Sequence, residues 1–117
     1  MKNTKMDSEV LDVKKDATSN WYAWNNLMPP GPISFHVIGD VDVPNPGVEV
    51  HLSERVPQGI NHRVIMLDLH LIQRPGIWPQ MVVKKQGRFD KVKAAYSEAE
   101  IFVGGALLAK LPVHDVF

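Results

Sequence analysis

The sequence contains no cysteine. This absence excludes disulfide scaffolds, zinc sites built from thiolates and any chemistry that depends on a thiol. Apolar runs are only a few residues long, far short of the roughly 18 residues of a membrane-spanning helix. Residues 1–5 carry charge with no apolar core behind them, so no secretory signal is predicted. We therefore expect a cytoplasmic protein with no membrane partner.

An excess of charge is also missing, because 13 lysine and arginine residues balance 13 aspartate and glutamate residues. General nucleic-acid binders carry a basic excess, so nucleic acid is not an expected partner. The sequence further lacks a phosphate-binding loop, the glycine pattern of dinucleotide sites, His-Glu-x-x-His and Gly-x-Ser-x-Gly. These absences favour a protein that is not an enzyme.

The 117 residues that are present suit a single domain. Residues 1–20 hold four lysines and four acids with few clustered apolar side chains. Such a segment buries too little to offset its ordering entropy. We predict a disordered or loosely attached tail over residues 1–20, or alternatively a short helix or strand near Val10, and a single folded domain over residues 21–117.

Apolar and polar residues alternate along most of that domain, with turn residues between the alternating stretches. Nine prolines and eight glycines supply the breaks. Strands are predicted at residues 33–43, 48–53, 63–73, 81–84, 100–103, 106–108 and 113–117. The segment 44–47 predicts a hairpin between the first two, and Gly104-Gly105 predicts a second hairpin. Residues 87–97 read as a loop or one to two helical turns.

This pattern predicts an all-β protein. The strand count and turn spacing favour an antiparallel β-sandwich that is immunoglobulin-like in architecture, with a small β-barrel as the alternative. Strand topology beyond the 33–53 hairpin is not determined by the sequence.

The 33–53 hairpin carries the first candidate for a metal site. Its register would place Asp42 opposite Glu49 and Asp40 opposite His51 on the polar face. Opposed carboxylates repel each other unless a cation neutralises them. Asp68 and His70 share the polar face of a later strand. The metal candidates are therefore His36, Asp40, Asp42, Glu49, His51, Asp68 and His70. The competing interpretation is a solvated polar face that holds no cofactor.

Aromatic residues supply the candidates for ligand or partner binding. Trp21, Tyr22 and Trp24 lie on one predicted strand and could expose a pair of rings as a stacking platform. The alternative is that this strand simply seals the core. Trp78 and Phe89 lie near turns and are further candidates for contact.

The neutral total hides two opposed stretches. Residues 40–54 contain four acids and no lysine or arginine, whereas residues 84–93 contain five bases and one acid. The basic stretch could touch a polyanion. It could equally be a solvated loop, or the electrostatic complement of the acidic stretch in the same or a neighbouring subunit.

The favoured hypothesis is a non-enzymatic module that binds a protein or a small ligand. One alternative is a metal-binding protein or metal-assisted enzyme that uses the His and Asp candidates. A second alternative is a self-assembling structural subunit, that is, a homo-oligomer.

Overall fold

The computed structural model describes residues 9–11 and 17–117. All of its regular elements are strands, as the sequence predicts. They are β1 (Glu9–Leu11), β2 (Thr18–Asn26), β3 (Ser34–Val43), β4 (Val48–Glu54), β5 (Val64–Gln73), β6 (Val83–Val92), β7 (Glu98–Val103) and β8 (Ala106–Val116). In the described part of the chain, no helix has the length and apolar character needed to cross a membrane.

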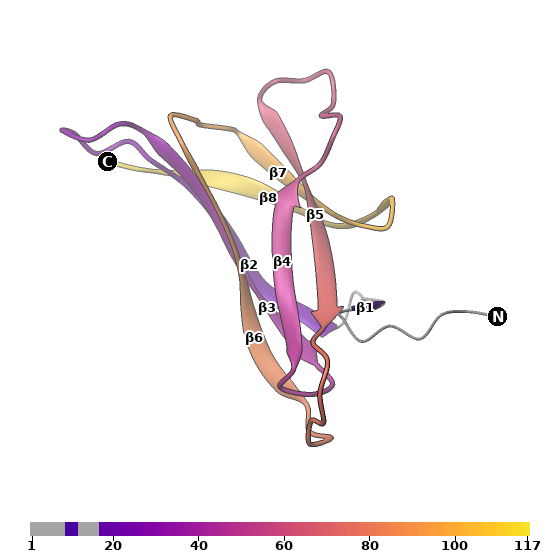
Figure 1. Cartoon of the computed structure of the whole chain (residues 1–117). Coiled ribbons are helices and arrows are strands. Elements are labelled where there is room, and N and C mark those ends of the chain that lie inside the picture. The colour runs from indigo at the N-terminus through magenta and orange to yellow at the C-terminus, as the bar shows by residue number, and fades with distance from the viewer. Residues whose placement is uncertain (1–8, 12–16) are drawn as a thin grey trace.

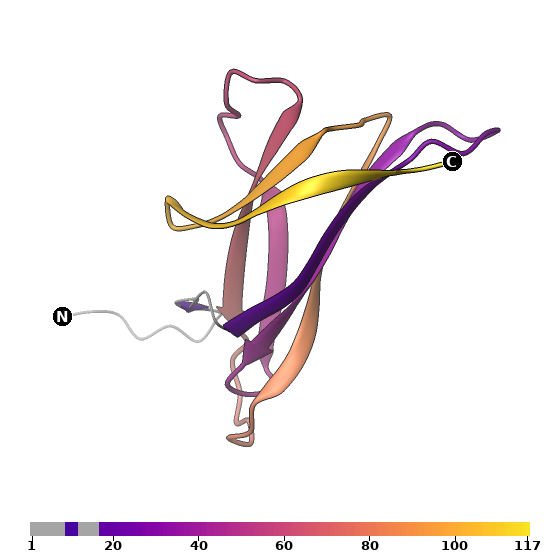
Figure 2. The ribbon, with the colours of Figure 1, turned by 180° about the vertical axis from the view of Figure 1, so that it is seen from behind.

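The strands form one mixed sheet in the order β4-β5-β7-β8-β2-β3-β6, with β1 sharing an edge of β5 with β7. Two of the pairings, β5 with β7 and β2 with β8, are parallel. The sheet curls until its edge strands β4 and β6 lie side by side (Figures 1 and 2). The structure thus supports the small barrel. It does not confirm the sandwich or immunoglobulin-like architecture, and the sheet is not purely antiparallel.

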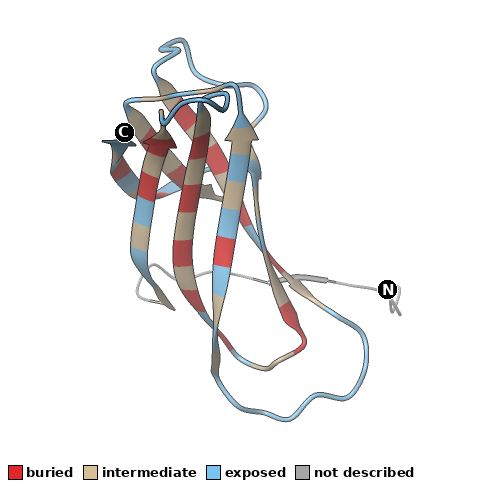
Figure 3. Cartoon of the chain, turned by 90° about the vertical axis from the view of Figure 1, so that its left-hand side faces the viewer, coloured by how far each residue is buried: buried red, intermediate tan, exposed pale blue. Residues whose placement is uncertain are grey.

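The interior of the barrel is lined by the apolar residues that alternate along the strands. On β3 and β5, every second residue is buried while its neighbours are half-buried or exposed (Figure 3). Such alternation places one face of each strand on the core. The largest fully buried side chains are Phe35, Ile65, Leu67, Leu69 and Ile101.

Residues 44–47 do not close the predicted 33–53 hairpin. The two edges of β3 are occupied by β2 and β6, and β4 pairs with β5 instead. The Asn45 side chain accepts a hydrogen bond from the Gly47 N–H at 2.9 Å, and the Trp78 ring covers Gly47 so closely that a Cβ there would lie 2.2 Å from the indole. The segment 44–47 therefore connects two strands, β3 and β4, that do not pair with each other. The predicted pairs Asp42–Glu49 and Asp40–His51 do not form.

The prediction of a loop or helical turns over residues 87–97 is wrong for most of that range, because β6 continues to Val92. The sequence did not identify this strand because lysines lie on the same face as Phe89, so the apolar residues do not alternate with period two. Lys85 donates to the Pro46 carbonyl at 2.7 Å, and Lys91 donates to Glu54 at 3.1 Å. Both lysines reach across from β6 toward the segment that contains β4, so their charge interrupts the apolar pattern without ending the strand.

The acidic and basic stretches face each other within the same chain. Lys84 bonds Asp42 at 3.1 Å, as the pairing of β3 with β6 requires. Together with the Lys91–Glu54 contact, this pairing supports one of the alternatives for the basic stretch, an electrostatic complement of the acidic stretch within the same chain.

The second predicted hairpin is confirmed. Gly104 and Gly105 both have positive φ, at 57° and 97°, which a two-residue turn between β7 and β8 needs. The strand predicted at 113–117 is not separate: β8 runs through Pro112, pairing first with β7 and then with β2. Of the predicted tail, residues 9–11 form β1 and residues 18–20 begin β2, while 1–8 and 12–16 lie outside the described residues.

Candidate ligand site at the barrel mouth

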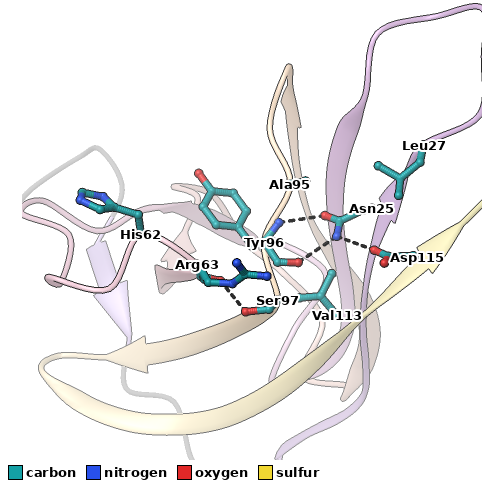
Figure 4. Close-up of a pocket in the computed structure, with 9 residues that line it drawn as sticks. All are labelled: Asn25, Leu27, His62, Arg63, Ala95, Tyr96, Ser97, Val113 and Asp115. Carbon is teal, nitrogen blue, oxygen red and sulfur yellow. Dashed lines mark hydrogen bonds between the residues drawn. The ribbon is translucent and has the colours of Figure 1, made fainter.

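A pocket of about 410 Å³ opens at the end of the barrel where the 55–63 and 93–97 segments turn. We call it the mouth pocket. It combines opposite charges with small apolar side chains (Figure 4). Its lining residues are Asn25, Leu27, His62, Arg63, Ala95, Tyr96, Ser97, Val113 and Asp115.

Asn25 fixes the geometry of the mouth pocket. It follows Ala23 at an inward position of β2 and is only 4% exposed. Its amide nitrogen donates to the Tyr96 carbonyl at 2.8 Å and to Asp115 Oδ1 at 2.9 Å, and its oxygen accepts from the Tyr96 N–H at 3.1 Å. A buried amide must be paired in this way. Asn25 therefore ties the β6–β7 connection to β2 and β8.

The pocket holds two charges of opposite sign that do not meet. Arg63 directly precedes β5, and Asp115 lies near the end of β8, opposite Asn25 in register. Within the described residues, the Arg63 guanidinium has no ion pair, and Asp115 accepts a side-chain hydrogen bond only from Asn25. The backbone carbonyl of Arg63 accepts hydrogen bonds from the Ser97 N–H at 2.8 Å and from the Ser97 hydroxyl at 3.1 Å. These bonds fix the backbone from which the Arg63 side chain extends.

A smaller pocket of about 190 Å³ adjoins the first and shares Tyr96 and His62 with it. Lys91 reaches into this region and donates to the Tyr96 hydroxyl at 3.0 Å as well as to Glu54. The hydrogen bond to Tyr96, followed by the one to Glu54, raises the pKa of Lys91 above its ordinary value. The second pocket is therefore lined by an ion pair that is already complete, whereas the charges of the mouth pocket have no charged partner among the described residues.

The predicted aromatic platform is split between the two faces of β2. Trp21 packs on the core over Gly39, and its buried indole nitrogen has no hydrogen-bond partner in the described part of the protein. Tyr22 and Trp24 point outward and join a row of ring contacts with two histidines. Tyr22 stacks on His114 at 5.0 Å, and Trp24 stacks on His36 at 5.0 Å. Partner binding by this row stays a prediction.

The other two aromatic candidates lie apart from the mouth pocket. Phe89 is half-buried and packs against Phe35, with ring centroids 6.3 Å apart. Trp78 is 38% exposed, covers Gly47 and helps line a hollow of about 470 Å³ that also contains Arg74 and Lys85.

The predicted metal ligands are distributed over three strands. His36, Asp40 and Asp42 lie on β3, whereas Glu49 and His51 lie on β4 and Asp68 and His70 on β5. His51 and His70 are opposite each other in register. No group of three or more potential ligands gathers anywhere in the described ranges.

Most of these side chains have protein partners instead. Asp68 accepts from Arg55 at 2.7 Å. The side-chain hydrogen bond from His51, followed by that from Arg74, lowers the pKa of Glu49 below its ordinary value. The carboxylates Asp68 and Glu49 on the polar face of β4 and β5 are therefore paired with basic residues of the same protein.

The residues that build the mouth pocket were not among the sequence candidates. One signal was present: Asn25 follows Ala23 by two, so a polar side chain occupies a position that alternation directs to the core. The placement of Arg63 and Asp115 at one pocket carried no such signal, because it depends on the parallel pairings β2–β8 and β5–β7.

Comparisons with protein-family models, with curated proteins and with solved structures found no match for this chain.

Proposed function

We propose that this protein is a binding module and that its mouth pocket holds a small zwitterion, a molecule with one ammonium and one carboxylate group. The observation that carries the proposal is the pair of opposite charges, Arg63 and Asp115, which line one pocket and form no ion pair with each other. Mouths of β-barrels are common sites for small ligands, and pockets of roughly 300–1,000 Å³ accommodate them. The mouth pocket lies in this range.

The chemistry of the lining supports a zwitterion over a simple anion. The planar guanidinium of Arg63 can bind a carboxylate through two parallel hydrogen bonds. The free oxygen of Asp115 can accept from an ammonium group. Leu27, Ala95 and Val113 add apolar surface to the same pocket, which suits an aliphatic side chain. An amino acid such as leucine presents all three features.

The rigidity of the mouth also supports binding. Three hydrogen bonds of Asn25 fix Tyr96 and Asp115 before any ligand arrives. A site that is already ordered loses less conformational entropy when it binds. The backbone of Arg63 is likewise held by the hydrogen bonds from Ser97.

Isothermal titration calorimetry with leucine and two matched analogues tests this proposal. N-acetyl-leucine lacks the ammonium and leucine amide lacks the carboxylate. We expect leucine to bind at least about tenfold more tightly than either analogue, because hydrogen bonds to charged groups contribute about 1.5–3 kcal/mol. Equal affinity for leucine and N-acetyl-leucine would show an anion site and reject the zwitterion.

Two variants assign the contacts. Arg63→Gln should remove the preference for leucine over leucine amide, and Asp115→Asn should remove the preference over N-acetyl-leucine. Lys110→Gln is the matched control, because Lys110 pairs with Glu98 on the surface and does not line the pocket. If the control variant weakens binding as much as Arg63→Gln does, the effect is general electrostatics and the assigned contacts are wrong.

A further inference from the structure

A second site lies on the outer face of the sheet, apart from the mouth pocket. Ser34 and His36 are two residues apart on β3 and therefore share a face. Ser34 Oγ lies 2.8 Å from His36 Nε2, and His36 Nδ1 lies 2.5 Å from Asp90 Oδ1 on the neighbouring strand β6. A hydroxyl, an imidazole and a carboxylate are thus linked in series through the two ring nitrogens.

The imidazole at the centre of this series is held on several sides. Asp90 faces His36 directly across the β3–β6 pairing, and Trp24 stacks on the imidazole ring from β2. Arg88 donates to the second oxygen of Asp90 at 2.9 Å. The His36 side chain is only 17% exposed. Its ring orientation is therefore fixed by packing as well as by hydrogen bonds.

We propose that Ser34, His36 and Asp90 form an acyl-transfer centre that accepts acyl groups from small esters. A nucleophile hydrogen-bonded to a base, with the base oriented by a third group, is the arrangement that activates serine. With its Nδ1 proton donated to Asp90, His36 has a free lone pair on Nε2 for the Ser34 proton. Ser34 and His36 are the reacting groups, and Asp90 is a positioning residue.

The reaction proceeds in two balanced steps. Ser34 Oγ attacks the ester carbonyl while its proton passes to His36 Nε2, and the bond to the alcohol breaks as His36 returns that proton to the departing oxygen. Water then attacks the acyl group on Ser34 and gives a proton to His36. The serine ester bond breaks, the carboxylic acid leaves and His36 restores the proton to Ser34.

Acyl transfer also needs a donor for the oxyanion and a surface for the acyl group, and two neighbouring residues are suited to these roles. Asn26 faces Ser34 across the β2–β3 pairing, and its side-chain oxygen already accepts from the Met28 N–H at 3.0 Å. In the proposed centre, its amide NH₂ would be the donor to the oxyanion that forms at the ester carbonyl. Val92, opposite Ser34 on β6, is 69% exposed and offers apolar surface to an acyl chain. The expected substrates are small esters with short aliphatic acyl groups.

The charge on Asp90 suits its positioning role. Burial acts to raise its pKa, but hydrogen bonds from His36 and then Arg88 outweigh this effect and hold the pKa of the carboxyl below its ordinary value. Asp90 is thus ionised at neutral pH and stabilises the imidazolium that forms during each step.

Labelling with an alkyl fluorophosphonate tests the proposal, because the probe forms a bond from serine Oγ to phosphorus as fluoride leaves. We expect a single adduct on the folded protein at pH 8, located at Ser34 by peptide mass mapping. Ser34→Ala should abolish the adduct. Ser53→Ala is the matched control, because Ser53 is an exposed serine on β4 and should leave labelling unchanged.

Variants of His36 and Asp90 test whether Ser34 reacts because it is activated or only because it is exposed. The labelling rate should fall by about 100-fold or more in His36→Gln, since general-base catalysis typically contributes 10²–10⁴-fold. Asp90→Asn should also slow labelling and change its pH profile, while the protein stays folded by circular dichroism. p-Nitrophenyl butyrate hydrolysis should follow the same order. No adduct at Ser34, or an equal rate in urea-unfolded protein, would overturn the proposal.

Discussion

Replacing Asn25 with alanine should destabilise the barrel more than any other single polar substitution at the mouth. The change deletes three hydrogen bonds and leaves the Tyr96 N–H, the Tyr96 carbonyl and Asp115 Oδ1 without their partner. Two of these bonds are neutral, at about 1 kcal/mol each, and one is to a charged group, at about 1.5 kcal/mol. Because Tyr96 is only half-buried and Asp115 is exposed, water recovers some of the loss. We expect the free energy of unfolding to fall by about 3 kcal/mol.

Urea unfolding followed by tryptophan fluorescence measures this loss. With a slope of roughly 1.5 kcal/mol/M, the midpoint should fall by about 2 M. Asn26→Ala is the matched control, because Asn26 is the next residue on β2 and its side chain accepts one exposed hydrogen bond, from Met28. The control should lose no more than about 0.5–1 kcal/mol. If Asn25→Ala falls within 1 kcal/mol of the control, Asn25 does not hold the mouth together and the reasoning is refuted.

Two further predictions concern the sheet. In Gly39→Ala the new Cβ would lie 2.1 Å from the Trp21 ring, so thermal unfolding should show a loss of stability of about 1–3 kcal/mol. Gly31→Ala is the control, because its Cβ would meet open space, and it should change stability by less than about 0.5 kcal/mol. Equal losses in the two variants would contradict the close packing of Trp21 on Gly39. Asp90 has a lowered pKa in the folded state, so its stabilising contribution is present above about pH 4 and is lost as the pH falls below that value. The stability of Asp90→Asn should therefore depend less on pH than that of the wild type between pH 4 and pH 2, and parallel acid limbs would reject the assignment.

The strand pattern was predictable wherever side chains alternate cleanly. Phe35, Val37 and Val41 on β3 alternate with half-buried residues, and the sequence shows this period directly. Gly104 and Gly105 identified their turn because few other residues tolerate positive φ at two successive positions. Local rules of this kind depend only on neighbouring residues.

Strand pairing was not predictable in the same way. The turn at 44–47 reads as a hairpin, yet Trp78, some 30 residues later, packs on Gly47 and β5 pairs with β4. A partner that distant in sequence leaves no trace in the turn itself. The polarity of β6 was misleading for a similar reason, because Lys85 and Lys91 find their acceptors on another part of the barrel.

The candidate site follows from those long-range pairings. Arg63 and Asp115 approach the same pocket only because the sheet closes through its parallel pairs. Ser34 and His36 are close in sequence, but Asp90 joins them only through the pairing of β3 with β6. Residue type alone therefore located neither candidate site, because each depends on strands that are far apart in the sequence.

The most direct test of the zwitterion site is a titration of ¹⁵N-labelled protein with leucine, followed by NMR. We predict saturable shifts of the Asn25 side-chain NH₂ and the Tyr96 amide, with the Trp24 indole signal on the outer face unchanged. Arg63→Gln should remove the saturation. Shifts that are absent, that never saturate, or that spread over the whole barrel would contradict a zwitterion site at the mouth.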